Sequence, residues 1–127
     1  MGRILLAEDE EALRGFLVRA LKQDGHEVSA ASDGAEALDT LTREKGGFDL
    51  LLTDIRMPIM DGIALALAAA RDYPELVILL MTGYADQRER AHGLDALVHD
   101  VITKPFTLAE IRALVTAALE AGVRSKR

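Results

Sequence analysis

The sequence predicts an α/β fold, a doubly wound parallel sheet of five strands with five helices. Short apolar runs alternate along the chain with longer segments of helical period. Each strand is followed by a helix, the order expected when right-handed crossovers join parallel strands and place helices on both faces of a sheet. The clearest apolar run, 76–81, suits a central strand that is covered on both faces.

Each element follows from a local pattern. Apolar runs predict the strands, and apolar positions three or four residues apart predict the helices. Gly25, the glycines at 46–47 and Tyr73–Pro74 end the first three helices. In order, we expect a strand at 4–7, a helix at 10–24, a weaker strand at 26–30 near an edge of the sheet, a helix from 33, a strand at 48–53, a helix at 62–72, a strand at 76–81, a charged and weakly periodic helix at 86–94, a strand at 97–102 and a helix from 107.

Three helix starts carry capping signals. Asp33 and Glu36 have the spacing of an N-cap and its partner, and Thr107 and Glu110 form a capping box. Asp61 is most simply the N-cap of the third helix. We expect one domain over 1–121, followed by a short basic tail over 122–127. Its last residues, 124–127, are expected to be a solvated end, with a degradation or docking signal as the alternative.

Composition excludes several classes of function. The chain of 127 residues is half hydrophobic and contains no cysteine, so disulfide scaffolds, zinc–thiolate sites and thiol nucleophiles are ruled out. The net charge is −6 and a basic stripe is missing, so we do not expect direct DNA binding. No apolar stretch reaches the roughly 20 residues that span a bilayer, and the start of the chain does not resemble a signal peptide. We therefore expect a cytoplasmic protein that is not associated with membranes.

Polar residues stand where the predicted strands end. Glu8 and Asp9 follow the first strand, Asp54 the third, Thr82 the fourth and Lys104 the fifth. The carboxyl ends of parallel strands meet at one edge of a sheet, where ligands of open α/β folds bind. Mg²⁺ would resolve the repulsion among the carboxylates. A carboxylate that accepts phosphate, a hydroxyl and a lysine suit phosphoryl transfer.

Taken singly, these residues have structural explanations. Glu8 and Asp9 could cap the first helix, and Asp54 could simply end a strand. Lys104 could be a solvated lysine in a turn, before a Pro105 whose cis or trans state the sequence leaves open. The functional interpretation is favoured because the fold brings four strand ends to one place.

The motifs around these residues resemble the receiver domain of two-component response regulators over 3–121. They are residues 5–10 (LLAEDE), 53–62 (TDIRMPIMDG), 81–84 (MTGY) and 103–106 (TKPF). The resemblance implies the flavodoxin-like strand order 2-1-3-4-5. It also implies that Asp54 is the phospho-acceptor and that Thr82 and Lys104 contact the phosphoryl group. Asp9 and the backbone carbonyl of Arg56 would be direct Mg²⁺ ligands. Glu8 would act on the metal indirectly, through a ligand or a bound water.

The resemblance also implies partners. The donor would be a phosphohistidine on a histidine kinase or histidine phosphotransferase. The opening residues 2–10 and the run 47–55 are similar to single-domain receivers of the CpdR type in alphaproteobacteria, a group associated with control of cell-cycle proteolysis. Only one helix follows Lys104, so we expect the output to be a contact with another protein, with a protease complex as one candidate.

The chain departs from the family pattern at several positions. Val101 replaces the usual Tyr or Phe three residues before Lys104, and Glu8 replaces a more usual Asp. Tyr84 is bulkier than the typical side chain two residues after the threonine, so we expect it to limit water access and slow self-dephosphorylation. We group Gly83, Tyr84 and Val101 as residues that modulate the switch.

Other classes remain to be weighed. A small hydrolase or phosphatase often has an acid two residues after the nucleophile, where this chain has Arg56. A dinucleotide-binding domain needs a glycine-rich turn after the first strand, where this chain has four acidic residues, 8–11. The strongest rival is an adaptor that keeps the fold but works mainly through unphosphorylated contacts.

Overall fold

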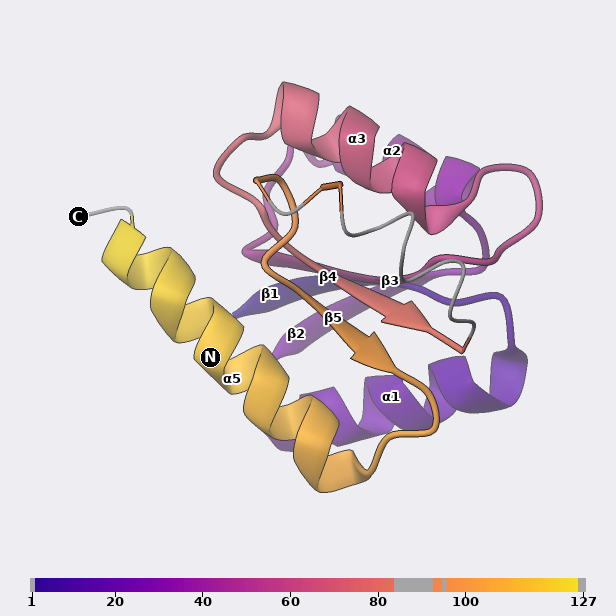
Figure 1. Cartoon of the computed structure of the whole chain (residues 1–127), viewed down its shortest axis with the longest axis vertical. Coiled ribbons are helices and arrows are strands. Elements are labelled where there is room, and N and C mark those ends of the chain that lie inside the picture. Colours follow the sequence, from indigo (N-terminus) through magenta and orange to yellow (C-terminus); the bar gives the residue numbers. More distant parts are fainter. Residues whose placement is uncertain (1, 84–92, 95, 126–127) are drawn as a thin grey trace.

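Five parallel strands form one sheet in the order β2-β1-β3-β4-β5, as expected (Figure 1). The computed structural model describes residues 2–83, 93–94 and 96–125. The weak second strand lies at an edge of the sheet, also as expected. The strands are β1 (Arg3–Ala7), β2 (Glu27–Ala31), β3 (Leu50–Asp54), β4 (Val77–Thr82) and β5 (Asp100–Thr103).

Helices cover both faces of the sheet. Figure 1 shows α2 and α3 on one face and α1 and α5 on the other. Their bounds are α1 (Glu11–Gln23), α2 (Gly34–Arg43), α3 (Gly62–Asp72) and α5 (Leu108–Ser125). These four are the helices of the described residues; the fifth one, expected at 86–94, falls almost entirely on 84–92, outside the described residues. Within the described chain, no helix is both long and apolar enough to cross a membrane.

The sheet separates two apolar clusters because neighbouring side chains of a strand point to opposite faces. In β1, Leu5 and Ala7 pack towards α2 and α3, whereas Ile4 and Leu6 pack towards α1 and α5. All four are fully buried. Strands of this kind read as continuous apolar runs, which is why the sequence predicts them without alternation.

Four strands, β2 to β5, begin later than expected, and for β4 and β5 the reason is that turns occupy the residues before them. The backbone N–H of Leu76 donates to the carbonyl of Tyr73, so β4 begins at Val77. The N–H groups of Leu97 and Val98 both donate to the carbonyl of Leu94, so β5 begins at Asp100 instead of residue 97. Their apolar side chains made the turn look like strand in the sequence.

The helix starts largely match their signals. The Asp61 carboxylate accepts the N–H of Ala64 at 2.8 Å, which confirms it as an N-cap. Thr107 and Glu110 form a reciprocal capping box, at 3.1 and 3.0 Å. Asp33 caps α2 by accepting the N–H of Glu36, whose carboxylate instead accepts the Ser32 hydroxyl. At the far end, α5 runs through the boundary expected after residue 121 and ends at Ser125.

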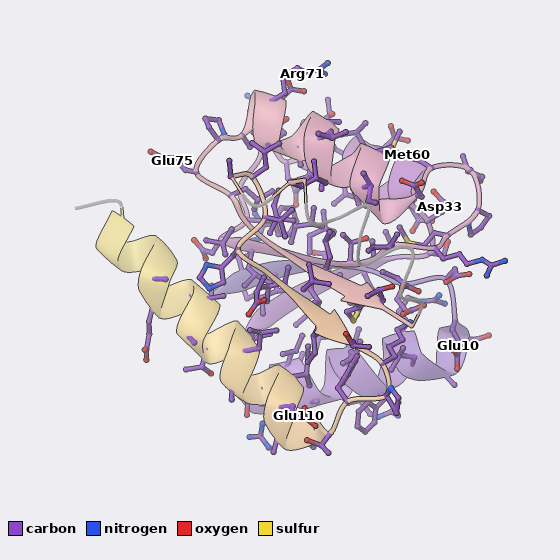
Figure 2. All side chains as sticks on the ribbon, in the orientation of Figure 1. Glu10, Asp33, Met60, Arg71, Glu75 and Glu110 are labelled. Carbon is purple, nitrogen blue, oxygen red and sulfur yellow. The ribbon has the colours of Figure 1, made fainter. Side chains whose placement is uncertain are left out.

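The loop after β3 is tied to the start of α2. The N–H of Gly34 donates to the carbonyl of Met60 at 3.2 Å, and Figure 2 shows Met60 beside Asp33. A Cβ at position 34 would lie 2.3 Å from that carbonyl oxygen, so the contact requires glycine. The loop that follows Asp54 is thereby held against the neighbouring helix.

Ile59 in this loop has a backbone φ of 71°, in the left-handed region, and a side chain that is 84% exposed. That region costs a β-branched residue about 1–2 kcal/mol, and Asn tolerates it far better. We therefore expect Ile59→Asn to raise the free energy of unfolding by about 1 kcal/mol in urea titrations. Ile59→Val keeps the branched side chain and should give no gain. Equal stability of both variants and the wild type would contradict this account.

Candidate functional site

The residues expected at the strand ends converge at one edge of the sheet. Asp54 is the last residue of β3, one position further along than expected, and Thr82 is the last residue of β4. Glu8 and Asp9 follow β1 directly, and Lys104 follows β5. Since all five strands are parallel, their carboxyl ends share this edge.

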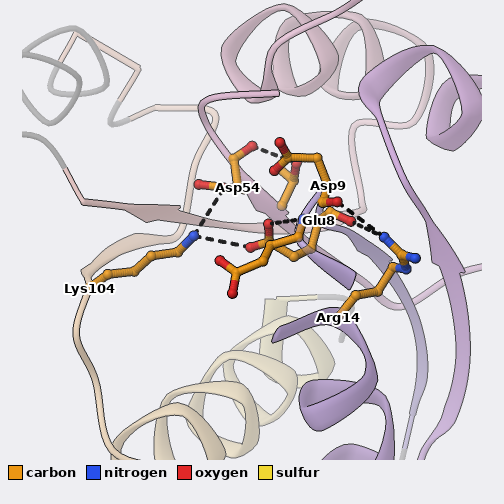
Figure 3. Close-up of polar contacts among 7 residues, drawn as sticks. Glu8, Asp9, Arg14, Asp54 and Lys104 are labelled. Atoms are coloured by element: carbon orange, nitrogen blue, oxygen red, sulfur yellow. Dashed lines mark hydrogen bonds and ion pairs between the residues drawn. The ribbon is translucent and has the colours of Figure 1, made fainter. Parts of the chain in front are cut away.

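Lys104 joins two of the three carboxylates. Its ammonium Nζ lies 3.0 Å from Oδ2 of Asp54 and 3.1 Å from Oε1 of Glu8 (Figure 3). The carboxylates are buried, with side-chain exposures of 9% for Asp54 and 1% for Glu8, whereas Lys104 is 25% exposed. The ammonium therefore neutralises negative charge that water reaches poorly.

The third carboxylate completes a group suited to a hard cation. Ligand oxygens of Glu8, Asp9 and Asp54 all lie within 4.8 Å of one another, and Asp9 is exposed. These residues line an open cleft together with Arg56 and Gly83. Mg²⁺ prefers such oxygen donors and keeps several waters, which the open side of the cleft can supply. The residues therefore fit Mg²⁺.

Burial dominates the acidity of Glu8. It raises the pKa of Glu8 to about 7, against the lowering effect of a hydrogen bond from the backbone N–H of Glu10 to Oε2 at 3.0 Å. The negative charge of Asp54 raises this pKa further, and Lys104 lowers it. In the metal-free protein, Glu8 therefore titrates near neutral pH.

Lys104 is held in its charged form. Burial alone would lower its pKa, but the hydrogen bond to Asp54 and the charges of Asp54 and Glu8 outweigh burial, so the pKa of Lys104 lies above its usual value. The ammonium is therefore protonated at physiological pH and can serve as a point charge for an anionic group.

The backbone around Asp54 is packed without spare room. The N–H of Gly62 donates to the carbonyl of Ile55 at 2.7 Å. A Cβ at position 62 would lie 2.0 Å from the Asp54 carbonyl oxygen. The glycine of the TDIRMPIMDG segment is thus required for α3 to start close behind the aspartate and fix its position.

Comparison with known proteins decides the family. The sequence profile described as "Response regulator receiver domain" matches residues 4–116, most of the chain. The chain belongs to this family. It is therefore a signalling receiver of two-component systems, and the resemblance drawn from the motifs is confirmed.

Curated relatives agree. The receiver is 43% identical to the response regulator receiver protein CpdR of Brucella abortus over 111 residues, 87% of this chain and 91% of that protein. It is 38% identical to the response regulator MprA of Mycobacterium leprae over 117 residues, 92% of this chain but 50% of MprA. The chain thus spans nearly all of the CpdR relative and half of the MprA relative.

Solved structures confirm the receiver fold. A CheY-like receiver domain protein from Methanospirillum hungatei superposes with a TM-score of 0.89 at 27% identity, covering 98% of both chains. The response regulator TrrA from Thermotoga maritima, solved in complex with Mg²⁺ and BeF, gives a TM-score of 0.83 at 29% identity, covering 93% of this chain and 99% of TrrA.

The remaining residues expected at the site lie around the acidic group. Thr82 is fully buried and pairs with Thr103 of β5, next to the pairing of Asp54 with Met81. Gly83 and Arg56 are exposed and line the cleft. Thr82 thus lies one residue beyond the β4 partner of Asp54.

Besides Glu8, the chain departs from the receiver pattern at Val101 and Tyr84. Val101 lies in β5 opposite Leu80 and packs against the apolar cluster under α2 and α3. It is half-buried there, at the position where the resemblance led us to expect Tyr or Phe. Tyr84 lies outside the described residues.

The motifs did not point to Arg14, which the structure places beside the acidic residues (Figure 3). Its Nη1 donates to the backbone carbonyls of Glu8 at 2.9 Å and Asp9 at 3.5 Å. Every residue has a backbone carbonyl, so a side chain that binds carbonyls has no partner residue that can be recognised in the sequence. The only available signal was a lone arginine one turn into the helix that follows the acidic pair.

Proposed function

We propose that this receiver accepts a phosphoryl group on Asp54 from a phosphohistidine and thereby switches its contacts with a protein target. The observation that carries this proposal is the pairing of the buried Asp54 carboxylate with Lys104, beside the carboxylates of Glu8 and Asp9. The donor is a histidine kinase or histidine phosphotransferase, as for other receivers, and the exchange takes place in the cytoplasm.

In the proposed step, a carboxylate oxygen of Asp54 attacks phosphorus and forms an O–P bond. The P–N bond of phosphohistidine breaks, and its electron pair returns to the imidazole nitrogen. Asp9, Asp54 and the Arg56 carbonyl would hold Mg²⁺, with Glu8 acting indirectly or through water, and the bound cation would supply positive charge that offsets the phosphoryl oxygens.

The chain's own cation and hydrogen-bond donor then stabilise the negative charge of the phosphoryl group. Phosphorylation adds roughly two negative charges. Lys104 already lies 3.0 Å from Asp54 and can move its hydrogen bonds to a phosphoryl oxygen, while the Thr82 hydroxyl donates to another. Their closure biases a two-state equilibrium of the nearby loops and surface. Slow hydrolysis of the acyl phosphate, limited by Tyr84, resets the receiver.

The test is phosphorylation by acetyl phosphate with Mg²⁺, followed by intact mass. We expect one phosphoryl adduct on the wild type and none on Asp54→Asn, because the amide oxygen is a poor nucleophile. Asp39→Asn, an exposed aspartate in α2, is the matched control and should be modified normally. An adduct on Asp54→Asn, or none on the wild type, would refute the assignment.

The downstream target is proposed from the similarity to CpdR, which suggests a role in cell-cycle proteolysis and a protease complex as the partner. A pull-down from the native cell with the phosphorylated wild type and Asp54→Asn as baits separates the two modes of action. Targets bound only by the phosphorylated form support a switch. Equal capture by both supports an adaptor that works through unphosphorylated contacts.

A further inference from the structure

Arg14 contacts the acidic segment from the side opposite Lys104. Figure 3 shows the Glu8–Asp9 segment between the two cations. Lys104 binds carboxylate oxygens, whereas Arg14 donates to the backbone carbonyls of Glu8 and Asp9. Arg14 therefore holds the main chain that carries these carboxylates and leaves their oxygens free.

The start of α1 needs such support. Its N-cap residue, Glu10, makes no side-chain cap hydrogen bond, unlike the N-cap residues of α2 and α3. The capping explanation for the acidic pair is therefore wrong for Asp9, and Glu8, besides its bond from Lys104, accepts the N–H of Glu10. Among the described residues, Arg14 is the side chain that ties this turn to the helix.

Asp9 depends most on that support. Within the described part of the chain, its carboxylate makes no hydrogen bond or ion pair, and the residue is exposed. Its place within 4.8 Å of Glu8 and Asp54 is therefore set by the backbone, which Arg14 holds through the two carbonyls. A carboxylate without side-chain partners loses its position when its backbone is released.

We propose that Arg14 is a positioning residue for the metal: its guanidinium fixes the Glu8–Asp9 backbone so that Asp9 presents its carboxylate to Mg²⁺. This inference rests on the proposed function. A competing effect has the opposite sign, because a cation near the site repels Mg²⁺. Arg14 is half-buried and binds carbonyls instead of the ligand oxygens, so solvent screens the repulsion and positioning dominates.

The test is Mg²⁺ binding by titration calorimetry at a temperature where every variant is folded. Removing the partners that hold a ligand typically weakens metal binding 10–100-fold, so we expect about a tenfold higher Kd for Arg14→Met. Arg14→Lys keeps the charge and one donor direction, so its Kd should lie between the Kd of the wild type and that of Arg14→Met. Arg19→Met, an exposed arginine in the same helix, should bind like the wild type.

A double-mutant cycle with Asp9→Asn separates positioning from general stability. If Arg14 acts through Asp9, Arg14→Met adds little to the loss that Asp9→Asn causes alone. Additive losses, or an equal or lower Kd for Arg14→Met, overturn the inference.

If Arg14→Met does not fold, Arg14→Lys and Arg14→Gln carry the same comparison. A wild type that takes up phosphoryl while Arg14 variants bind Mg²⁺ normally refutes this inference alone; a wild type that neither binds Mg²⁺ nor takes up phosphoryl refutes both proposals.

Discussion

Replacing Lys104 with methionine is expected to lower the free energy of unfolding of the metal-free protein by about 2 kcal/mol at slightly alkaline pH. The ammonium lies within hydrogen-bond distance of Glu8 and Asp54, and its loss leaves two buried carboxylates facing each other. The cost stays below the roughly 3–5 kcal/mol of a fully buried pair for two reasons. Lys104 is 25% exposed, so water can replace it, and Glu8 can take up a proton.

The same variant is expected to bind Mg²⁺ about tenfold more tightly, because the ammonium competes with the cation for the carboxylate oxygens. Urea titrations in chelator and calorimetry with Mg²⁺ measure the two effects. Lys22→Met, at an exposed position of α1, is the matched control and should show neither. Unchanged metal-free stability together with weaker Mg²⁺ binding would show that Lys104 supports the metal site instead of competing with it.

Removing Lys104 and removing Arg14 are thus expected to change Mg²⁺ affinity in opposite directions, although both residues are cations beside the same acidic group. Lys104 donates to ligand oxygens of Glu8 and Asp54, so removing it frees ligands. Arg14 donates to main-chain carbonyls, so removing it frees the backbone and disorders a ligand. The atom that each cation touches, and not the charge alone, decides the sign.

The convergence of the site was predictable because it follows from topology. Once the apolar runs are assigned to parallel strands, the residues after each run must share one edge, and Asp54 and Lys104 lie 3.0 Å apart at their closest atoms. The sequence could not show that Lys104 also bonds Glu8, because that depends on side-chain reach across the edge. The raised pKa of Glu8 was equally hidden, since burial is a property of the whole fold.

Local strain and main-chain contacts were out of reach for a different reason. A positive φ is usually signalled by glycine or asparagine, but position 59 carries isoleucine, which gives no warning. The bonds from Arg14 end on backbone carbonyls that every residue has. The apolar residues Leu97 and Val98 predicted a strand because hydrophobicity alone does not distinguish an apolar turn from a strand.

Glu8→Gln is expected to remove a loss of stability that the wild type suffers as pH rises. The pKa of Glu8 is about 7 in the folded protein, against the ordinary value of 4.5 that we take for the unfolded chain. Between these values the folded state holds a proton that the unfolded state has released, so the free energy of unfolding falls with increasing pH. The favourable contribution is complete below 4.5 and is lost as pH rises through about 7.

For the metal-free wild type, the size of this loss is about 3 kcal/mol, since one pKa unit corresponds to about 1.4 kcal/mol. Glutamine has no proton to lose, so the stability of Glu8→Gln relative to the wild type should rise by about 3 kcal/mol from about pH 4 to about pH 8 in chelator. Glu75→Gln, an exposed change far from Glu10 in Figure 2, should leave the profile unchanged. Parallel profiles for Glu8→Gln and the wild type would contradict the burial argument. Saturating Mg²⁺ should flatten the wild-type profile, because a bound cation favours the ionised carboxylates and removes the reason for Glu8 to hold its proton.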